Sequence, residues 1–345
     1  MTAPWSDILA DAGAEWSGDG TLRHFADPLQ ELHAAEETGI VTPLTEMGVL
    51  GAYGEDARDF LHGQLTHSVT DLPPDRWRLA GYCSPKGRLL ALFRLLADDG
   101  GVLALTHGSL QDATLQRLHM FVLRARVALE DLNDRLAAVG LAGPPAGELL
   151  AELAGTPPAE PGAVTEAGDL RVLRLNDAGG PRFVLLAPHA ELAAVWHMLG
   201  RGLTPAGRDA WELLAIRAGE PEITAATREA FVPQMVNLEL IDGVSFGKGC
   251  YPGQEIVARM HYRGQAKRRM FRVSTAGTDL PEIGAAVRTA GGQEAGAIVR
   301  AAPNTQNRAE ALAVLSLQYA ANEALYVDER PLQLDTLPYP IPTGE

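Results

Sequence analysis

The spacing of apolar residues predicts alternating helices and strands over most of the chain. Near the start, Asp27-Pro28 precedes apolar positions at helical spacing and Gly39 supplies a stop, so a short acidic helix is expected between them. The turn 84–88 has the composition of a hairpin turn between two strands. The predicted strands are 77–83, 89–96, 101–106, 122–129, 170–175 and 182–186, and the predicted helices are about 55–62, 109–120, 190–199 and 208–218.

Proline and glycine divide this pattern into parts. Segment 143–162 contains five prolines and has the composition of a linker, so we expect a seam between two subdomains there. After Met270 only short strand-like runs remain, separated by Gly, Pro and Asn, which favours a small β-barrel. The expected fold class is therefore α+β. The expected parts are an acidic N-terminal extension at 1–40, an α+β region at 41–265, a C-terminal β-barrel at 266–333 and a loose tail at 334–345.

Composition and charge exclude several classes of protein. The 345 residues are 46% hydrophobic, which is enough for two or three domains with real cores and excludes a disordered chain. The formal net charge of −15 argues against a surface that wraps DNA. The first 37 residues lack the basic and apolar regions of a signal peptide, and no apolar run approaches the roughly 20 residues of a membrane span. We therefore expect a cytoplasmic protein that binds neither a membrane nor DNA directly.

The two cysteines point to a reactive thiol rather than to a structural framework. Cys83 and Cys250 lie far apart without a Cys-x-x-Cys pair, so we expect no disulfide and no metal or iron–sulfur cluster held by this chain alone. Cys250 stands two residues after Lys248 and just before a predicted helix with Pro252 in its first turn; both features favour a thiolate. Glycines on either side favour an exposed loop, and the alternative is a small buried core residue. Cys83 is expected to be buried and inert.

Cys250 lies in a recognisable signature. Residues 248–259 spell Lys-Gly-Cys-Tyr-Pro-Gly-Gln-Glu-Ile-Val-Ala-Arg, which resembles the signature of the YgfZ family, folate-binding iron–sulfur maintenance proteins related to the glycine-cleavage T-protein, an aminomethyltransferase. Similar blocks occur in the family's order at 54–66, 83–88 and 231–234, and the resemblance extends from about residue 44 to 333. Besides Cys250, the motif residues are Lys248, Gly249, Tyr251, Gly253, Gln254, Glu255 and Arg259.

The resemblance implies a fold and a function. The implied fold is a three-domain ring in which two ferredoxin-like α+β units, interleaved in sequence, and a C-terminal β-barrel surround a central channel. The channel would bind tetrahydrofolate or another folate. Through the thiol of Cys250, the protein would support assembly or repair of [4Fe-4S] enzymes, including tRNA-modifying methylthiotransferases, with those enzymes or their assembly factors as partners. The implied folate contacts are Met47, Trp211, Arg217 and Lys248; for Met47 and Trp211 an ordinary core position is the alternative.

Departures from the related aminomethyltransferases bear on activity. Those enzymes place an Asp pair where this chain has Leu90-Ala91, so a group for general acid or base catalysis is missing there and we expect no aminomethyl transfer. Arg217 stands where relatives often have Glu, and Gln254 stands where T-proteins typically have Arg. The alternatives are an active folate-dependent aminomethyltransferase and a thiol-dependent enzyme that shares the scaffold.

A basic stretch overlaps the signature. From residue 248 to 272 there are seven basic residues and the single acid Glu255, in a protein of net charge −15. We expect several of these side chains to line the channel mouth beside Cys250 and to bind an anion, either a folate polyglutamate tail or a phosphate-bearing partner. The alternative is a solvated face that pairs with the acidic N-terminal segment. The expected anion contacts are Arg263, Lys267 and Arg268.

Overall fold

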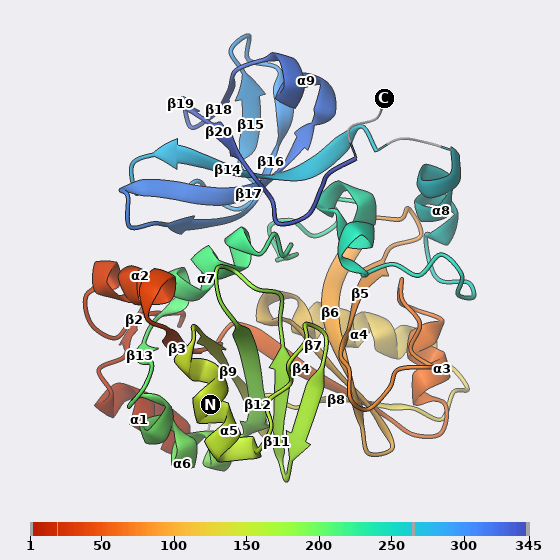
Figure 1. The fold of residues 1–345 in the computed structure, drawn as a ribbon. Coiled ribbons are helices and arrows are strands. Elements are labelled where there is room, and N and C mark those ends of the chain that lie inside the picture. Colours follow the sequence, from red (N-terminus) through yellow and green to blue (C-terminus); the bar gives the residue numbers. More distant parts are fainter. Residues whose placement is uncertain (1–2, 19, 264–265, 343–345) are drawn as a thin grey trace.

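Three large β-sheets, a small two-stranded sheet and the helices that cover them make up the molecule, which the computed structural model describes for residues 3–18, 20–263 and 266–342. Figure 1 shows the C-terminal sheet above the other two, with helix α7 (Arg208–Arg217) at the junction of the three. This arrangement confirms the expected α+β class with three domains. No helix in the described ranges is long and apolar enough to span a membrane.

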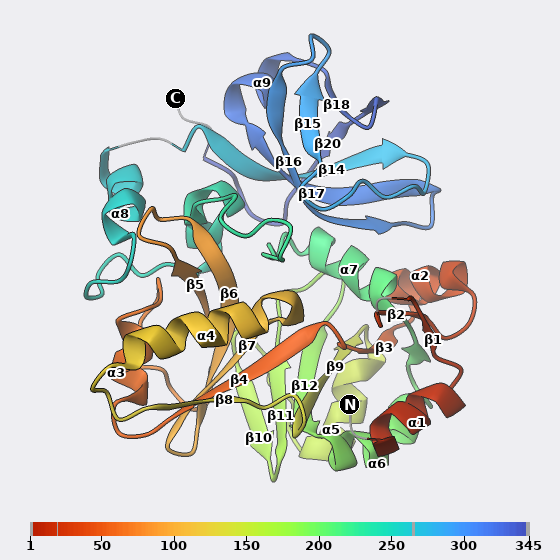
Figure 2. The same ribbon diagram turned by 180° about the vertical axis from the view of Figure 1, so that it is seen from behind.

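The first sheet contains the predicted hairpin. Its five antiparallel strands follow the order β5 (Arg78–Cys83), β6 (Leu89–Asp98), β7 (Gly101–His107), β4 (Met47–Tyr53) and β8 (Ala128–Asp131). Figure 2 shows α4 (Gln111–Val122) along one side of this sheet, with α3 (Ala57–His62) near its end. The strand predicted at 122–129 is mostly wrong, because Leu123 turns the chain after α4 with a φ of 46° and pairing starts only at Ala128.

The strands of the second sheet come from segments that precede and follow the first sheet in the sequence, so the two α+β units are interleaved. Its order is β10 (Val164–Ala167), β11 (Leu170–Arg174), β12 (Arg182–Pro188), β9 (Leu136–Ala142), β3 (Ile40–Pro43) and β13 (Thr204–Pro205). Apolar patterning missed β9, because that strand is rich in Ala and Gly and is buried over most of its length. Segment 143–162 joins β9 to β10 within this sheet, and the chain crosses between the sheets at 44–46 and 132–135 instead.

The acidic N-terminal segment packs into this second unit. Helix α1 (Ala3–Asp11) lies against α6 (His189–Leu199), where Trp5 meets Trp196 edge to face with ring centroids 5.5 Å apart. Trp5 and Leu9 are fully buried, so residues before position 41 contribute to the hydrophobic core. The unit also includes β1 (Glu15–Trp16), β2 (Leu22–His24) and α5 (Pro145–Ala154).

Helix α2 (Pro28–Glu37) confirms the predicted capping. Asp27 precedes Pro28, and its carboxylate accepts the backbone N–H of Leu29 at 2.9 Å. The buried Glu31 carboxylate accepts the N–H of Gly207 at 2.8 Å, just before α7 begins. The N-terminal segment is thereby tied to the central helix.

The third sheet is a nearly closed barrel, as expected. Its seven antiparallel strands follow the order β19 (Arg330–Pro331), β18 (Leu325–Val327), β15 (Ala286–Thr289), β16 (Glu294–Pro303), β17 (Arg308–Ser316), β14 (Arg268–Ala276) and β20 (Gln333–Asp335). Helix α9 (Leu317–Asn322) follows β17. Between α7 and the barrel lie two 3-10 turns, η2 (Pro233–Val236) and η3 (Leu238–Ile241), and helix α8 (Gln254–Arg263).

The prediction of a loose C-terminal tail is wrong for its described part. Leu337 is buried in the core around the first sheet. The Tyr339 hydroxyl donates to the carbonyl of Gly219 at 2.7 Å. The tail therefore packs against the chain that leaves α7, because it carries an apolar and an aromatic side chain that find partners there.

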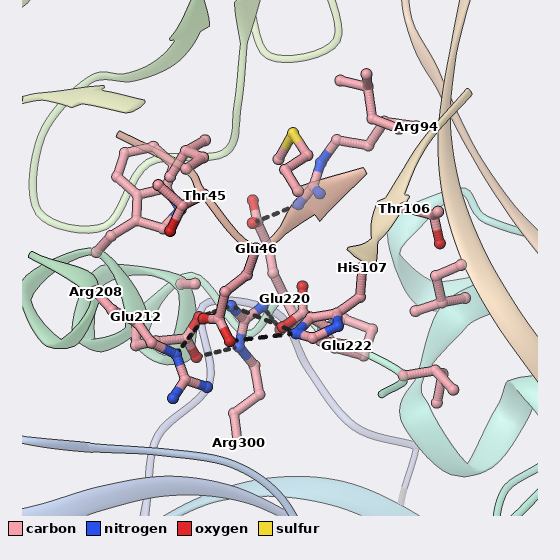
Figure 3. A pocket seen from close by; sticks show the side chains of 18 of the residues that line it. Thr45, Glu46, Arg94, Thr106, His107, Arg208, Glu212, Glu220, Glu222 and Arg300 are labelled. Carbon is pink, nitrogen blue, oxygen red and sulfur yellow. Dashed lines mark hydrogen bonds and ion pairs between the residues drawn. The ribbon is translucent and has the colours of Figure 1, made fainter. Parts of the chain in front are cut away.

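A buried ion network joins the three sheets. Glu220, just after α7, lies 3.1 Å from Arg94 of β6 and 3.2 Å from Arg182 of β12. Arg300 of the barrel strand β16 donates to the Glu220 carbonyl at 3.2 Å and pairs with Glu212 of α7 at 2.5 Å. Each sheet thus contributes one arginine to this network: Arg94 and Arg182 pair with Glu220, and Arg300 contacts Glu212 and the Glu220 carbonyl. Figure 3 shows Arg94, Arg300 and the two glutamates. Burial alone raises the pKa of Glu220, but Arg182, Arg94 and Arg300 together hold it below its usual range.

Replacing Glu220 by Ala is expected to destabilise the protein strongly. The change leaves Arg94 and Arg182 buried without their counter-charge, and breaking a buried pair in this way costs about 3–5 kcal/mol of the free energy of unfolding. Urea unfolding followed by fluorescence measures the loss. Because the folded-state pKa is lowered, the wild-type contribution is present above the ordinary value of 4.5 and disappears as the pH falls below it, so the two proteins should converge in acid.

The matched control is Glu160→Ala, which removes an exposed carboxylate. It should change the free energy of unfolding by less than about 0.5 kcal/mol. Equal effects of the two substitutions at neutral pH would contradict the importance of the network.

Candidate functional site

Two glycines bring the signature loop against the hairpin turn of the first sheet. Gly253 has a φ of +79°, and a Cβ there would lie 2.5 Å from the Ser84 carbonyl oxygen and 2.6 Å from Gly87 Cα. Gly87 has a φ of +68°, and its Cβ would lie 2.9 Å from Cβ of Ile256. Both positions combine left-handed backbone with close approach, so each requires glycine. Blocks 83–88 and 248–259, far apart in the chain, therefore form one surface.

Helix α8 starts directly after this contact. Its first-turn N–H groups of Ile256 and Val257 bond to the Gly253 carbonyl at 3.1 and 3.3 Å. Pro252 was expected in the first helical turn but lies in the turn before it, since the contact at Gly253 sets the start of the helix at Gln254. Glu255 does lie in the first turn, where its charge complements the helix dipole.

Lys248 anchors the loop to the end of α3. Its Nζ donates to the carbonyl oxygens of His62 and Leu65, the latter at 2.7 Å, and lies 4.9 Å from the ring centroid of Tyr251. Burial lowers the pKa of Lys248 to about 8. Gly249 lies beside the His62 ring, where an added Cβ would be 3.7 Å from Nε2. Lys248 therefore fixes the position of the residues that precede Cys250.

The two cysteines occupy opposite environments. Cys250 is exposed, as its flanking glycines predict, and the alternative of a buried core residue is wrong. Cys83 is fully buried, and burial raises the pKa of its thiol to about 12, which confirms the expectation of an inert side chain. Of the two thiols, that of Cys250 is therefore the one that a reagent or partner can reach.

The remaining motif blocks support the same surface. Gln234 donates to the Val257 carbonyl at 2.8 Å, which fixes α8 from the side of η2. The Thr66 hydroxyl donates to the Gly243 carbonyl and accepts the N–H of Gly81, both at 2.7 Å. The blocks that carry the family resemblance thus converge in space, although they span some 200 positions of sequence.

A cavity of about 840 Å³, including its opening to solvent, lies between the three sheets beside α7. Trp211 and Met47 line it, as the resemblance implies. Gly140 makes room for the indole, because a Cβ there would lie 2.6 Å from the Trp211 ring. Arg182 stacks on that ring with its guanidinium carbon 4.7 Å from the centroid. The cavity wall is therefore partly aromatic and apolar.

The other two implied folate contacts lie elsewhere. Arg217 pairs with Glu36 and Glu310, each at 2.7 Å, and does not line the cavity. Lys248 is held by the carbonyl groups at the end of α3 and does not line it either. Of the four side chains, the structure brings only Met47 and Trp211 together at the cavity.

Sequence reasoning missed most of the polar side chains of the cavity. They come from six separate segments without a common motif, so spacing along the chain carries no signal of them. Which charged side chains are buried, and which of them meet, can be determined only from the folded structure. These side chains are Glu46, Arg94, His107, Arg208, Glu212, Glu220, Glu222 and Arg300, and Figure 3 shows them gathered around one space.

Leu90 and Ala91, the positions that the resemblance compares with the Asp pair of aminomethyltransferases, lie in a closed, apolar part of β6. Leu90 and Ala91 are 2% and 0% exposed and belong to the hydrophobic core. Leu92, Phe93 and Arg94 of the same strand line the cavity. The side chains of β6 that face the cavity therefore begin after this buried apolar pair.

The basic stretch is partly neutralised within the fold. Arg269 pairs with Glu239 at 2.5 Å and Arg272 with Glu310 at 2.8 Å. The expected anion contact Lys267 is exposed and Arg268 is half-buried, and neither lines the cavity. The side chain of Arg263, the third expected contact, lies outside the described residues. In the described ranges no group of three His, Cys, Asp or Glu side chains is placed to hold a metal ion.

Comparison with known proteins identifies the family. The GCVT N-terminal domain family matches residues 21–243. The "tRNA-modifying protein YgfZ" of Colwellia psychrerythraea is 32% identical over 243 residues, which cover 70% of this chain and 74% of that protein. The chain belongs to the YgfZ family. The YgfZ proteins of Klebsiella pneumoniae and Pectobacterium carotovorum are 34% and 29% identical and cover 67% and 90% of this chain and 70% and 94% of their own lengths.

A solved structure supports the YgfZ-type fold over the whole chain. The glycine cleavage system aminomethyltransferase T from Bartonella henselae superposes with a TM-score of 0.77 and covers 98% of this chain and 97% of its own. At 16% sequence identity this likeness concerns the fold alone. The three-domain ring expected from the resemblance is therefore confirmed.

The two thiols of this YgfZ-family protein should differ sharply in reactivity. Iodoacetamide applied to the native protein at pH 8 should add one carbamidomethyl group, at Cys250, whereas Cys83 should react only after unfolding. Mass spectrometry of the intact protein and of its peptides gives the count and the position. Cys250→Ser should give no adduct in the native state and Cys83→Ala should give one. A native adduct at Cys83 would contradict the burial described here.

Proposed function

We propose that this YgfZ-family protein binds a tetrahydrofolate in its central cavity and supports [4Fe-4S] enzymes that modify tRNA through the thiol of Cys250. The observation that carries the proposal is the presentation of Cys250. It is exposed on a loop that two glycines and Lys248 hold in place, while the other cysteine is buried. The relatives are named tRNA-modifying proteins, and this name supports the proposal that the enzymes served are ones that modify tRNA.

The chemistry of the cavity fits a folate. The cavity opens to solvent and combines apolar walls with a few charged groups, as sites for small organic ligands do. Trp211, Phe93 and Met47 offer surfaces for flat rings, and Arg208 and Glu46 offer charged groups to donors and acceptors. A bound tetrahydrofolate would supply a carrier for one-carbon groups. The residues of this chain would orient it and exclude water.

The proposal separates binding from group transfer. The apolar pair Leu90 and Ala91 lies where aminomethyltransferases carry Asp, so we expect the ligand to be bound without aminomethyl transfer. The competing function is an active aminomethyltransferase. Release of methylenetetrahydrofolate from an aminomethyl carrier by the purified protein would favour that competing function.

Tetrahydrofolate should bind to the purified protein under reducing conditions, and Trp211→Ala should weaken binding by about tenfold or more, since the indole supplies a large aromatic contact. Isothermal titration calorimetry measures both. Phe121→Ala removes an exposed aromatic side chain away from the cavity and should bind like wild type. If the wild-type protein binds no tetrahydrofolate, the folate part of the proposal is wrong.

Cys250→Ser should abolish function in cells without unfolding the protein. The side chain is exposed, so its free energy of unfolding should change by less than about 0.5 kcal/mol. Methylthiolated tRNA nucleosides, measured by mass spectrometry in a strain that lacks its own YgfZ, should fall to the level of the empty vector. Cys83→Ala is the matched control and should restore them. Full restoration by Cys250→Ser would overturn the role of the thiol.

A further inference from the structure

Glu46 lies at the centre of the polar side of the cavity. It belongs to the turn 44–46 between β3 and β4, where its carbonyl accepts the N–H of Gly108 at 2.7 Å. Its Oε2 lies 2.5 Å from Nε of Arg208, and its Oε1 lies 3.8 Å from Nε2 of His107. The carboxylate thus faces a permanent cation on one side and an imidazole on the other (Figure 3).

His107 is held in one orientation. Its Nδ1 accepts the backbone N–H of Ser109 at 3.2 Å and lies 2.8 Å from the Ser109 hydroxyl. The neutral imidazole therefore carries its hydrogen on Nε2. That atom faces Glu46 and also Glu222, whose Oε2 is 4.0 Å away. An N–H donor is consequently directed between two carboxylates at the cavity wall.

The other charged groups of the cavity are engaged with one another. Arg300 of β16 pairs with Glu212 of α7, and Arg94 of β6 pairs with Glu220. Arginine partners hold the pKa of Glu212 and of Glu220 below the usual range despite burial.

Glu46 behaves in the opposite way. Burial outweighs the attraction of Arg208 and His107, so the pKa of Glu46 is raised. Of the cavity carboxylates whose pKa is shifted, Glu46 therefore takes up a proton most readily.

The cavity also has free hydrogen-bonding capacity. Thr42 and Thr106 line it and are 1% and 6% exposed. Their hydroxyl groups have no hydrogen-bond partner within the described residues. Buried polar groups are normally paired, so a ligand or ordered water is expected to complete them. Glu46 and the two hydroxyls border the same space.

We propose that the cavity takes up one proton together with its ligand, and that this proton is held between a carboxylate oxygen of Glu46 and a nitrogen of the ligand. The ligand class is a nitrogen heterocycle that presents a ring or amine nitrogen to the carboxylate. The proton comes from solvent, and only O–H and N–H bonds change. Glu46 thus gives the cavity a group that can hold a proton against the bound ligand, whereas Leu90 and Ala91 lie in the hydrophobic core.

This inference rests on the proposed function, and tetrahydrofolate is the probe. Titration calorimetry in phosphate and in Tris at the same pH gives the number of protons taken up from the difference in heat between the buffers. Wild type should take up between a fraction of a proton and one proton, and its affinity should rise as the pH falls, by up to about tenfold per pH unit. Glu46→Gln should bind with no proton uptake and an affinity that does not change with pH.

Two further variants locate the proton. His107→Gln should still take up a proton, but with a midpoint at higher pH, because the imidazole lowers the pKa of Glu46. Glu160→Gln changes an exposed carboxylate outside the cavity and should behave as wild type. A structural role for Glu46 alone would change affinity without changing proton uptake, so the two readouts separate the roles.

The outcomes are distinct for the two proposals. Binding of tetrahydrofolate by wild type without proton uptake overturns the inference and leaves the proposed function standing. Uptake that persists in Glu46→Gln and disappears in His107→Gln places the proton on the imidazole and also overturns it. No binding of tetrahydrofolate at all overturns both.

Discussion

The architecture depends on a charge constraint at the middle of the molecule. Glu212 lies on α7 and Glu220 lies just after it. These two glutamates form ion pairs with Arg94, Arg182 and Arg300, one arginine from each sheet. Taking these charges out of water is costly, and only close pairing offsets the cost. One hydrophobic cluster joins the first sheet to the barrel and another joins the first sheet to the second, and the ion network adds a charged junction where all three sheets meet. Helix α7, tied to the N-terminal segment by Glu31, is the element on which all three converge.

The same network forms one side of the central cavity. Buried guanidinium and carboxylate groups need polar partners, and where Arg94, Glu212, Glu220 and Arg300 gather, the cavity wall is polar. Trp211, supported by Arg182 and by the missing side chain at Gly140, forms the apolar side. Arg94 and Arg300 are engaged with glutamates, and Glu46 and His107 face each other across 3.8 Å on the same polar side.

Whether the sequence predicts a structural feature depends on how far apart in the chain its interacting residues lie. Local patterns predict the hairpin around Gly87 and the cap at Asp27, since both depend on neighbours in the chain. The motif around Cys250 correctly predicts an exposed thiol. Strand β9 is missed because a buried strand rich in Ala and Gly has no alternation. The resemblance predicts a ligand contact at Arg217, but this side chain pairs with Glu36 and Glu310. Both glutamates lie too far from Arg217 in the sequence for a local pattern to indicate the pairing. The polar cavity arises in the same long-range way.

Strand β6 runs from the turn that contacts the signature loop of Cys250 to the wall of the cavity. At its start, the turn with Gly87 touches Gly253 of the signature loop, and further along Phe93 and Arg94 line the cavity. Phe93 lies six positions after Gly87, with the strand starting at Leu89, so the two are at most roughly 20 Å apart along the chain. Since no described residue of the loop 246–253 lines the cavity, a ligand at Phe93 and a partner at Cys250 occupy separate places. Strand β6 is one physical connection between the two places: its turn supports the signature loop, and its Arg94, paired with Glu220, belongs to the ion network that joins the sheets.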